Sequence, residues 1–191
     1  MTRKKLNQIA FSLFVIMLVF AAGCRRTPPP ANTGKTTPAK PPPPPAQKLG
    51  SSGLTLTNNQ RVRLSDYAGK VVVLDFYATW CEPCRAETPL LVKLQQQYSA
   101  QGLQVIGLNV GGDDDRDKVP AFAKEFGIQY PLGFPDDDLY DQFLSDNENI
   151  PQSFVFDRNG ALVKRLIGYD PDSGELEGAI QAALVNKTSG N

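Results

Sequence analysis

The chain has 191 residues, a formal net charge of zero and no histidine. All 20 acidic residues follow residue 48, but only 12 of the 20 basic residues do, so residues 49–191 carry a net charge of −8. An acidic domain argues against nucleic acid as a partner, and about 140 residues suffice for one hydrophobic core. We therefore expect one folded domain at residues 49–191, preceded by two segments of other kinds.

Residues 1–23 predict a secretory signal, because a basic start at residues 3–5 precedes an apolar run at residues 9–20. This run is shorter than the ~20 residues that span a bilayer, although an uncleaved membrane anchor is an alternative. The small residues before Cys24 resemble the lipobox of bacterial lipoproteins, whose cysteine becomes the lipidated first residue of the mature chain. The resemblance implies that Cys24 is lipidated and holds the protein to a membrane, outside the cytoplasm.

Residues 24–48 predict a tether. The segment holds nine of the 16 prolines and no acidic residue. Such a composition cannot bury a core and extends as polyproline II. Its basic charge also suits the surface of an anionic bilayer.

Hydrophobic patterns predict an α/β domain with a central mixed sheet flanked by helices. The expected elements are a hairpin of strands at 54–57 and 61–64, a strand at 71–77, a helix at 82–98, a strand at 103–109, helices at 119–126 and 138–144, a hairpin of strands at 153–157 and 161–167, and a helix at 175–186. The nearly continuous apolar runs at 71–77 and 103–109 suit strands buried on both faces. With the helix between them they form a β-α-β unit, whose strands are expected to be parallel.

Cys81 and Cys84 stand where the first buried strand ends and its helix begins. The unpaired N–H groups and the dipole of a helix N-terminus stabilise a thiolate, which predicts that Cys81 is the nucleophile and the more exposed thiol. Zinc would need about four ligands, and a staple closing so short a loop stabilises little. The chain has no histidine and only one other cysteine, so no metal, covalent haem or Cys-His catalysis is expected. Redox exchange is the favoured interpretation.

Two acidic residues fall at positions expected to be buried. Glu87 shares a helical stripe with Leu91 and Leu94, one turn from Cys84, and Asp75 interrupts the apolar strand that leads to Cys81. A buried acid beside a thiol pair can take up or return protons. The alternatives are that Glu87 pairs with a surface lysine and that Asp75 makes a structural hydrogen bond.

A second acidic pattern, Asp113, Asp115 and Asp117, alternates as calcium ligands do. Lys118 and Lys124 stand where an EF-hand needs its turn glycine and closing glutamate. A calcium site is therefore not expected.

The run from Trp80 to Cys84 (W-C-E-P-C), the strand before it and Pro89 resemble the thioredoxin superfamily. With residues 66–70 (D-Y-A-G-K), they are similar to the membrane-anchored TlpA/ResA-type thiol–disulfide oxidoreductases over roughly residues 54–184. The resemblance implies a thioredoxin fold with an N-terminal β-hairpin, no cofactor other than a Cys81–Cys84 disulfide, and catalytic residues in addition to the two cysteines.

Glu87 matches the active-site glutamate of ResA-type members, and Asp75 matches the buried aspartate of thioredoxin, whose lysine partner is replaced near Gly107. The resemblance also implies a cis proline at Pro151 and a TlpA-type insertion before it, at residues 111–146. The implied substrate-binding residues are Trp80, Glu82, Pro83, Ile150 and Pro151.

The expected function is reduction of disulfides in envelope proteins, for example in cytochrome c maturation, by a monomer that a membrane thiol donor reduces again. The reducing direction rests on negative charge at Glu82, Asp75 and Glu87, which disfavours thiolates, while Arg85 is expected to be solvated. Two alternatives are a non-catalytic binding module with a thioredoxin fold and a redoxin-type peroxidase.

Overall fold

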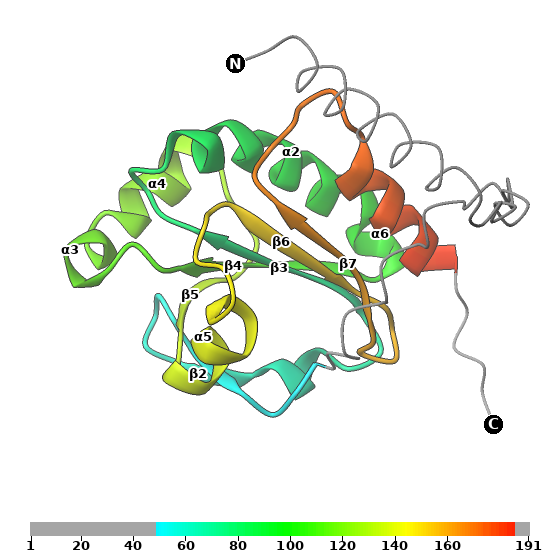
Figure 1. Ribbon diagram of the computed structural model, residues 1–191, viewed down its shortest axis with the longest axis horizontal. Coiled ribbons are helices and arrows are strands. Elements are labelled where there is room, and N and C mark those ends of the chain that lie inside the picture. Colours follow the sequence, from blue (N-terminus) through cyan, green and yellow to red (C-terminus); the bar gives the residue numbers. More distant parts are fainter. Residues whose placement is uncertain (1–48, 186–191) are drawn as a thin grey trace, which may run out of the picture. The chain divides into compact units, whose positions relative to one another are not determined.

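The computed structural model describes residues 49–185 (Figure 1). Three segments lie outside this range: the predicted signal at 1–23, the predicted tether at 24–48, which begins with Cys24, and the tail at 186–191. Within it, no helix combines the length and the apolar character needed to cross a membrane.

Seven strands form one sheet, in the order β2-β1-β5-β4-β3-β6-β7. The strands are β1 (Gly53–Leu56), β2 (Arg61–Arg63), β3 (Val71–Tyr77), β4 (Leu103–Asn109), β5 (Leu132–Pro135), β6 (Gln152–Phe156) and β7 (Leu162–Ile167). β3, β4 and β5 are parallel, whereas β1 and β6 pair with this central group in the antiparallel sense. The mixed sheet and the parallel β3–β4 pair confirm the predicted β-α-β unit.

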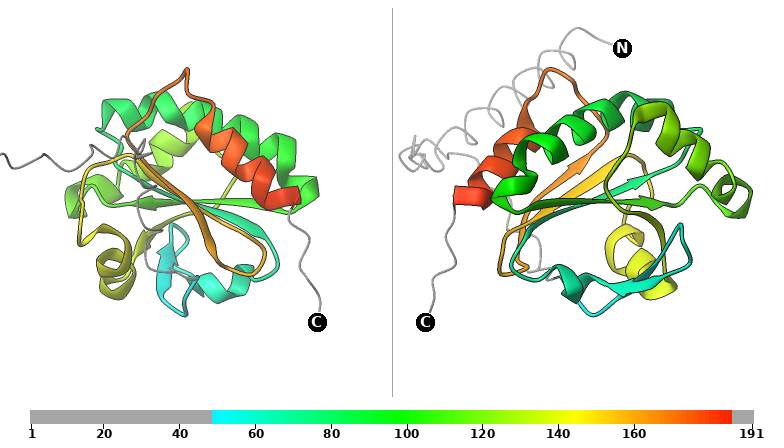
Figure 2. Two further views of the ribbon diagram at one scale, coloured as in Figure 1. Left: turned by 45° about the vertical axis from the view of Figure 1, so that its right-hand side comes forward. Right: turned by 180° about the vertical axis from the view of Figure 1, so that it is seen from behind.

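The helices are α2 (Glu82–Tyr98), α3 (Asp113–Arg116), α4 (Val119–Phe126), α5 (Asp137–Leu144) and α6 (Glu175–Val185), with short 3-10 turns η1 (Leu64–Tyr67) and η2 (Ser99–Gln101). α2, α4 and α6 cover one face of the sheet, and α5 lies on the other face (Figures 1 and 2). Each face buries its own apolar cluster, so the sheet is the middle of three layers.

Alternation along β3 assigns its side chains to these two clusters. Val73 and Tyr77 point toward α2 and α6, whereas Leu74 and Phe76 pack with Phe143 of α5. Asp75 has the parity of Val73 and Tyr77, and it is therefore on the face that α2 covers.

The two predicted hairpins are present. β1 and β2 pair in register around a turn in which Asn59 has a φ of 65°, and β6 and β7 pair around a turn in which Gly160 has a φ of 73°. Both values lie in the left-handed region, where asparagine and glycine are the least strained residues.

Residue patterns located neither the one-turn helix α3 nor the strand β5, which is short and holds Gly133 between Leu132 and Phe134. It joins the hairpin to the rest of the sheet by pairing with β1 on one side and β4 on the other. A Cβ at Gly133 would lie 2.7 Å from the Thr55 carbonyl oxygen, so only glycine allows β5 to come this close to β1.

We expect Gly133→Ala to lower the free energy of unfolding by about 1–3 kcal/mol, because the added methyl group must push β1 away from β5. Gly178→Ala is the matched control, since Gly178 lies exposed within α6 with open space around it. That change should instead raise stability by about 0.5–1 kcal/mol. Equal effects of the two substitutions in chemical denaturation would contradict the close approach.

Candidate active site

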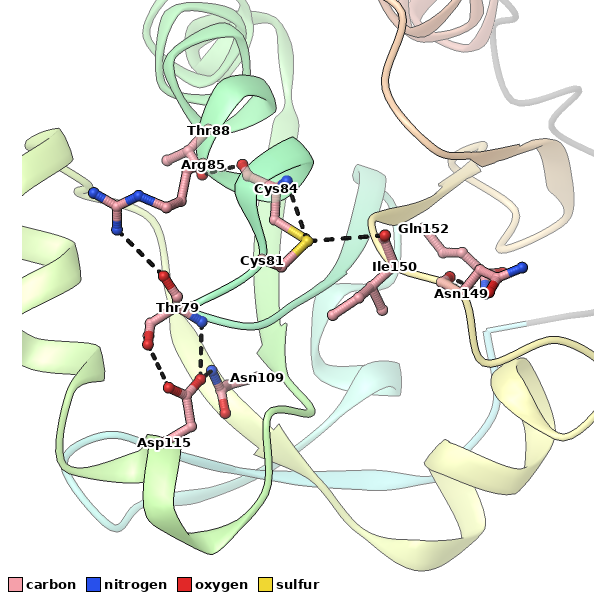
Figure 3. The surroundings of a disulfide bond; sticks show 10 residues. All are labelled: Thr79, Cys81, Cys84, Arg85, Thr88, Asn109, Asp115, Asn149, Ile150 and Gln152. Carbon is pink, nitrogen blue, oxygen red and sulfur yellow. Dashed lines mark hydrogen bonds between the residues drawn. A yellow bond between two sulfur atoms is a disulfide. The ribbon is translucent and has the colours of Figure 1, made fainter.

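The site lies at the carboxyl end of β3, where the chain turns into α2 (Figure 3). Cys81 is the N-cap residue of α2, and its sulfur accepts a hydrogen bond from the Cys84 N–H at 3.3 Å. Cys81 and Cys84 form a disulfide, with their Cα atoms 5.3 Å apart. Pro83 occupies the first turn, where a missing N–H leaves no hydrogen bond unmade. One N–H of this helix end, that of Cys84, is thus directed at the Cys81 sulfur.

The loop before β6 faces the disulfide. The Ile150–Pro151 peptide bond is cis, as the resemblance implied. The Ile150 carbonyl oxygen lies 3.8 Å from the Cys81 sulfur. A disulfide sulfur carries no proton, so this is a contact in the oxidised state and becomes a possible hydrogen bond when Cys81 is a thiol.

The residues expected to contact a substrate differ widely in exposure. The Trp80 side chain is 63% exposed, and Glu82 and Pro83 are also exposed, whereas Pro151 is buried. Cys81 is 5% exposed and Cys84 2%, so the expected order holds, but both residues are buried in the oxidised state. Trp80 is therefore the largest apolar surface beside the sulfur atoms.

Asp75 and Glu87 interact electrostatically on the face of the sheet that α2 covers. Each is only 4% exposed. Ser153 of β6 lies opposite Asp75 in register, and its hydroxyl donates to Glu87 Oε1 at 3.1 Å. On the other side Asp75 lies opposite Gly107 of β4, where no side chain is present. The predicted burial of both acids is confirmed, and Glu87 makes its hydrogen bond to Ser153 rather than an ion pair to a surface lysine.

Burial raises the pKa of Glu87 to about 7, although the hydrogen bond from Ser153 lowers it. Burial, and then the charge of Glu87, raise the pKa of Asp75 well above its ordinary value. Asp75 Oδ1 and Glu87 Oε2 have no hydrogen-bond partner. A protonated carboxyl group tolerates burial far better than a carboxylate, so this pair holds at least one proton near neutral pH.

Glu87 also lines a surface pocket of about 240 Å³. The pocket lies between α2, which contributes Leu90 and Lys93, and the segment at 168–177 that leads into α6. Leu90 is half-buried and packs against the core cluster on this face of the sheet. The pocket gives the buried Glu87 a route to solvent.

A hydrogen-bond network that residue patterns did not predict holds the loop before Pro151. The side-chain amide of the fully buried Gln152 donates to the Asn147 and Asn149 carbonyls at 2.6 and 2.7 Å. Its oxygen accepts from Arg165 Nε at 2.9 Å. The Arg165 guanidinium in turn binds both carboxylate oxygens of Asp146 at 2.6 and 3.0 Å. The only available signal was the position of Gln152, directly after the expected cis proline.

Arg85, which was expected to be solvated, is 31% exposed and also makes several contacts within the chain. Its guanidinium lies over the rings of Phe122 and Phe126, 5.7 and 5.1 Å from their centres, and forms an ion pair with Glu125. It also donates to the Thr79 carbonyl at 3.2 Å. Its charge is therefore held beside the loop that precedes Cys81.

The acidic run at 113–117 does not form a metal site in the described chain. Among residues 49–185, no group of three or more acidic or cysteine side chains is placed to hold an ion. Asp115 is buried and turned toward Thr79, whereas Asp113 and Asp117 are exposed.

Comparison with known proteins agrees with this geometry. Residues 46–165 match the AhpC/TSA family. The thiol-disulfide oxidoreductase ResA of Bacillus subtilis is 34% identical over 116 residues, which are 59% of this chain and 61% of the relative. ResA of Bacillus cereus is 30% identical over 128 residues, 67% of this chain and 72% of the relative.

A crystal structure from Chlorobium tepidum, described as a thiol:disulfide interchange protein DsbE, is 34% identical. It superposes with a TM-score of 0.63 over 73% of this chain and 96% of that chain. The matches with the first ResA relatives span about three fifths of their own length, 61% and 63%. The family match over residues 46–165 includes β3, the cysteine pair and the loop at Ile150 and Pro151.

The raised pKa of Glu87 predicts a pH-dependent stability. The folded state keeps a proton on Glu87 up to a pH of about 7, whereas the unfolded state loses it near 4.5. The free energy of unfolding should therefore fall as the pH rises between these values, by about 3 kcal/mol for this group.

Glu87→Gln keeps an acceptor for Ser153 and removes the titration. The stability of this variant relative to the unmodified protein should therefore be greater at pH 8 than at pH 5. Asp75 adds a slope of the same sign, so some pH dependence remains in the variant. If the free energies of unfolding of the two proteins, measured in urea between pH 4 and 8, run parallel, the pKa of Glu87 is not raised.

Proposed function

Because the chain belongs to the AhpC/TSA family of the thioredoxin superfamily, we propose that it is a thiol–disulfide oxidoreductase that reduces disulfides in other proteins. The observation that carries this proposal is the Cys81–Cys84 disulfide, which caps α2 and faces the loop at Ile150 and Pro151. The names of the ResA and DsbE relatives support the same chemistry.

In the proposed reaction, the Cys81 thiolate attacks one sulfur of a partner disulfide. A mixed disulfide forms, and the other partner sulfur leaves as a thiolate and takes a proton. Cys84, deprotonated by a nearby carboxylate, then attacks Cys81 Sγ, which releases the second partner thiol and forms the Cys81–Cys84 disulfide. Two electrons pass to the partner, and two protons follow them.

Glu87 is the better placed of the two acids to handle these protons. It lies one helical turn from Cys84, has a pKa of about 7 and borders the pocket that reaches solvent. A general acid or base works best with a pKa near the working pH. Burial, and then the charge of Glu87, raise the pKa of Asp75 well above its ordinary value, so Asp75 releases its proton less readily.

The reducing direction follows from the negative charge around the pair. A strong oxidant needs a strongly stabilised thiolate, and Asp75 and Glu87 oppose that stabilisation whenever either is ionised. The position of Arg85 beside the Thr79 carbonyl weakens this opposition without removing it. The disulfide form is thereby favoured, and the dithiol gives its electrons away.

The proposal extends to the cellular setting. The basic start, apolar run and Cys24 support a lipoprotein held to the extracytoplasmic face of a membrane, with envelope proteins such as apocytochrome c as substrates. Cys24 is the only further cysteine and would be lipidated, so the oxidised pair needs an outside thiol donor at the membrane to be reduced again.

Disulfide exchange tests the chemistry directly. We expect the protein to reduce insulin in the presence of dithiothreitol, and Cys81→Ser to abolish the reaction. Cys84→Ala should instead accumulate a mixed disulfide with its partner, which non-reducing electrophoresis and mass spectrometry would identify. Equal insulin reduction by the Cys81→Ser variant would support a non-catalytic module, and rapid peroxide consumption with slow insulin reduction would support the peroxidase.

The role of Glu87 has its own test. We expect the pH dependence of the rate of Cys81 alkylation in the reduced protein to differ between Glu87→Gln and the unmodified protein. The reason is that the variant cannot exchange a proton with the thiol pair. An identical titration would make Glu87 structural and Asp75 the better candidate.

A further inference from the structure

Thr79, two residues before Cys81, has all of its polar groups bonded (Figure 3). Its N–H donates to Asp115 Oδ2 at 2.8 Å, and its hydroxyl donates to Asp115 Oδ1. Its carbonyl accepts from Arg85 Nη1 at 3.2 Å. Thr79 is therefore fixed from two sides, by α3 and by α2, before the chain reaches the cysteine.

Asp115 is dedicated to this contact. It is 1% exposed, and besides the two bonds from Thr79 it accepts one from Asn109 Nδ2 at 2.8 Å. Asn109 is the last residue of β4 and is itself buried. A carboxylate that is removed from water needs several donors, and here most of them come from the loop that leads to the site.

The titratable groups that face Asp115 are Lys118, whose ammonium lies 3.9 Å away and is exposed, and Tyr77 of β3. Burial alone would raise the pKa of Asp115. The hydrogen bonds from Asn109 and Thr79, with the charge of Lys118, outweigh burial and hold the pKa below its ordinary value. Asp115 is thus an acceptor for all three donors at neutral pH.

Two glycines after β4 make room for the Asp115 side chain. A Cβ at Gly111 would overlap the Asp115 carboxylate and lie 2.8 Å from Asp115 Cβ, and Gly112 has a φ of 88°. Both glycines are needed for the segment after β4 to fold back beneath Thr79. A side chain and a backbone that depend on each other in this way indicate a specific contact, not an incidental surface bond.

From these contacts we infer that Asp115 is a positioning residue for the redox pair. By fixing Thr79 it holds the segment that carries Trp80 and Cys81, and it thereby keeps the Cys81 sulfur aligned with the N–H groups of α2. The inference rests on the proposed thiol chemistry, but its test reads the thiol itself and needs no partner protein.

The direction in which the Cys81 pKa changes when Asp115 is replaced distinguishes a positioning role from an effect of its charge. Removal of a nearby negative charge lowers the pKa of a thiol, because the thiolate is repelled less. Loss of alignment with a helix N-terminus raises the pKa, toward the value of a free cysteine. Positioning by Asp115 therefore predicts the direction opposite to the one that its charge predicts.

The experiment compares Asp115→Asn, Thr79→Val and Asp113→Asn in the full chain, solubilised in detergent and reduced. An asparagine at 115 leaves at least one Thr79 donor unpaired, and a valine at 79 removes only the hydroxyl bond with little change of shape. Asp113 is exposed on the same short helix, so Asp113→Asn removes the same charge without the contact. The pH profile of Cys81 alkylation gives the thiol pKa, and thermal unfolding reports whether each variant is folded.

We expect Asp115→Asn and Thr79→Val to raise the Cys81 pKa by roughly half a unit or more, with Asp113→Asn close to the unmodified protein. A lower Cys81 pKa in Asp115→Asn would overturn the inference in favour of charge alone. An unchanged pKa in Thr79→Val, the milder variant, together with a lower melting temperature, would overturn it in favour of a purely structural role. If insulin reduction fails for the unmodified protein while these pKa shifts are found, the proposed function fails and the positioning role stands.

Discussion

The whole site depends on one placement, that of a sulfur atom at the amino end of α2. The first N–H groups of a helix lack partners within the helix, and a cap must supply an acceptor. Here the acceptor is the reactive atom itself, since the Cys84 N–H donates to Cys81 Sγ. β3 brings the chain to this point from inside the core, with every one of its seven residues buried. The helix end and the buried strand together fix the position of the Cys81 sulfur, which is the nucleophile in the proposed reaction.

A second determinant of the site is the negative charge of two acids on the face of the sheet that α2 covers. Asp75 and Glu87 are buried on the same face of the sheet, and one hydroxyl, that of Ser153, donates to them. A helix end favours a thiolate and an ionised acid disfavours it, so in the proposed reaction the protonation state of the acids would tune the redox pair. Gly107, which lies opposite Asp75, has no side chain that could pair with these acids.

Sequence patterns located the helices and strands that are determined by their own residues. β3, α2 and β4 begin and end where their apolar runs predict, and both hairpins have turn residues that suit a left-handed backbone. β5 escaped prediction because its identity as a strand comes from pairing with β1 and β4, not from its own four residues. The contacts of Asp115 and Gln152 escaped for the same reason. An alternating acidic run suggests an ion, and only the fold-back at Gly111 shows that one of these acids serves Thr79 instead.

The two edges of the described sheet have a consequence for how copies of the protein meet. β2 carries Arg61 and Arg63, and β7 carries Lys164 and Arg165. Three of these cations are already bonded within the chain, Arg61 to Asp136, Lys164 to Glu175 and Arg165 to Asp146. A strand from another molecule that added to either edge would have to displace such a pair, or set like charges against each other across the new ladder. Charged edges of this kind discourage sheet-to-sheet aggregation. Where many copies of the protein lie close together, their strand edges would therefore stay unpaired. The disulfide of each copy would then stay free to meet other molecules.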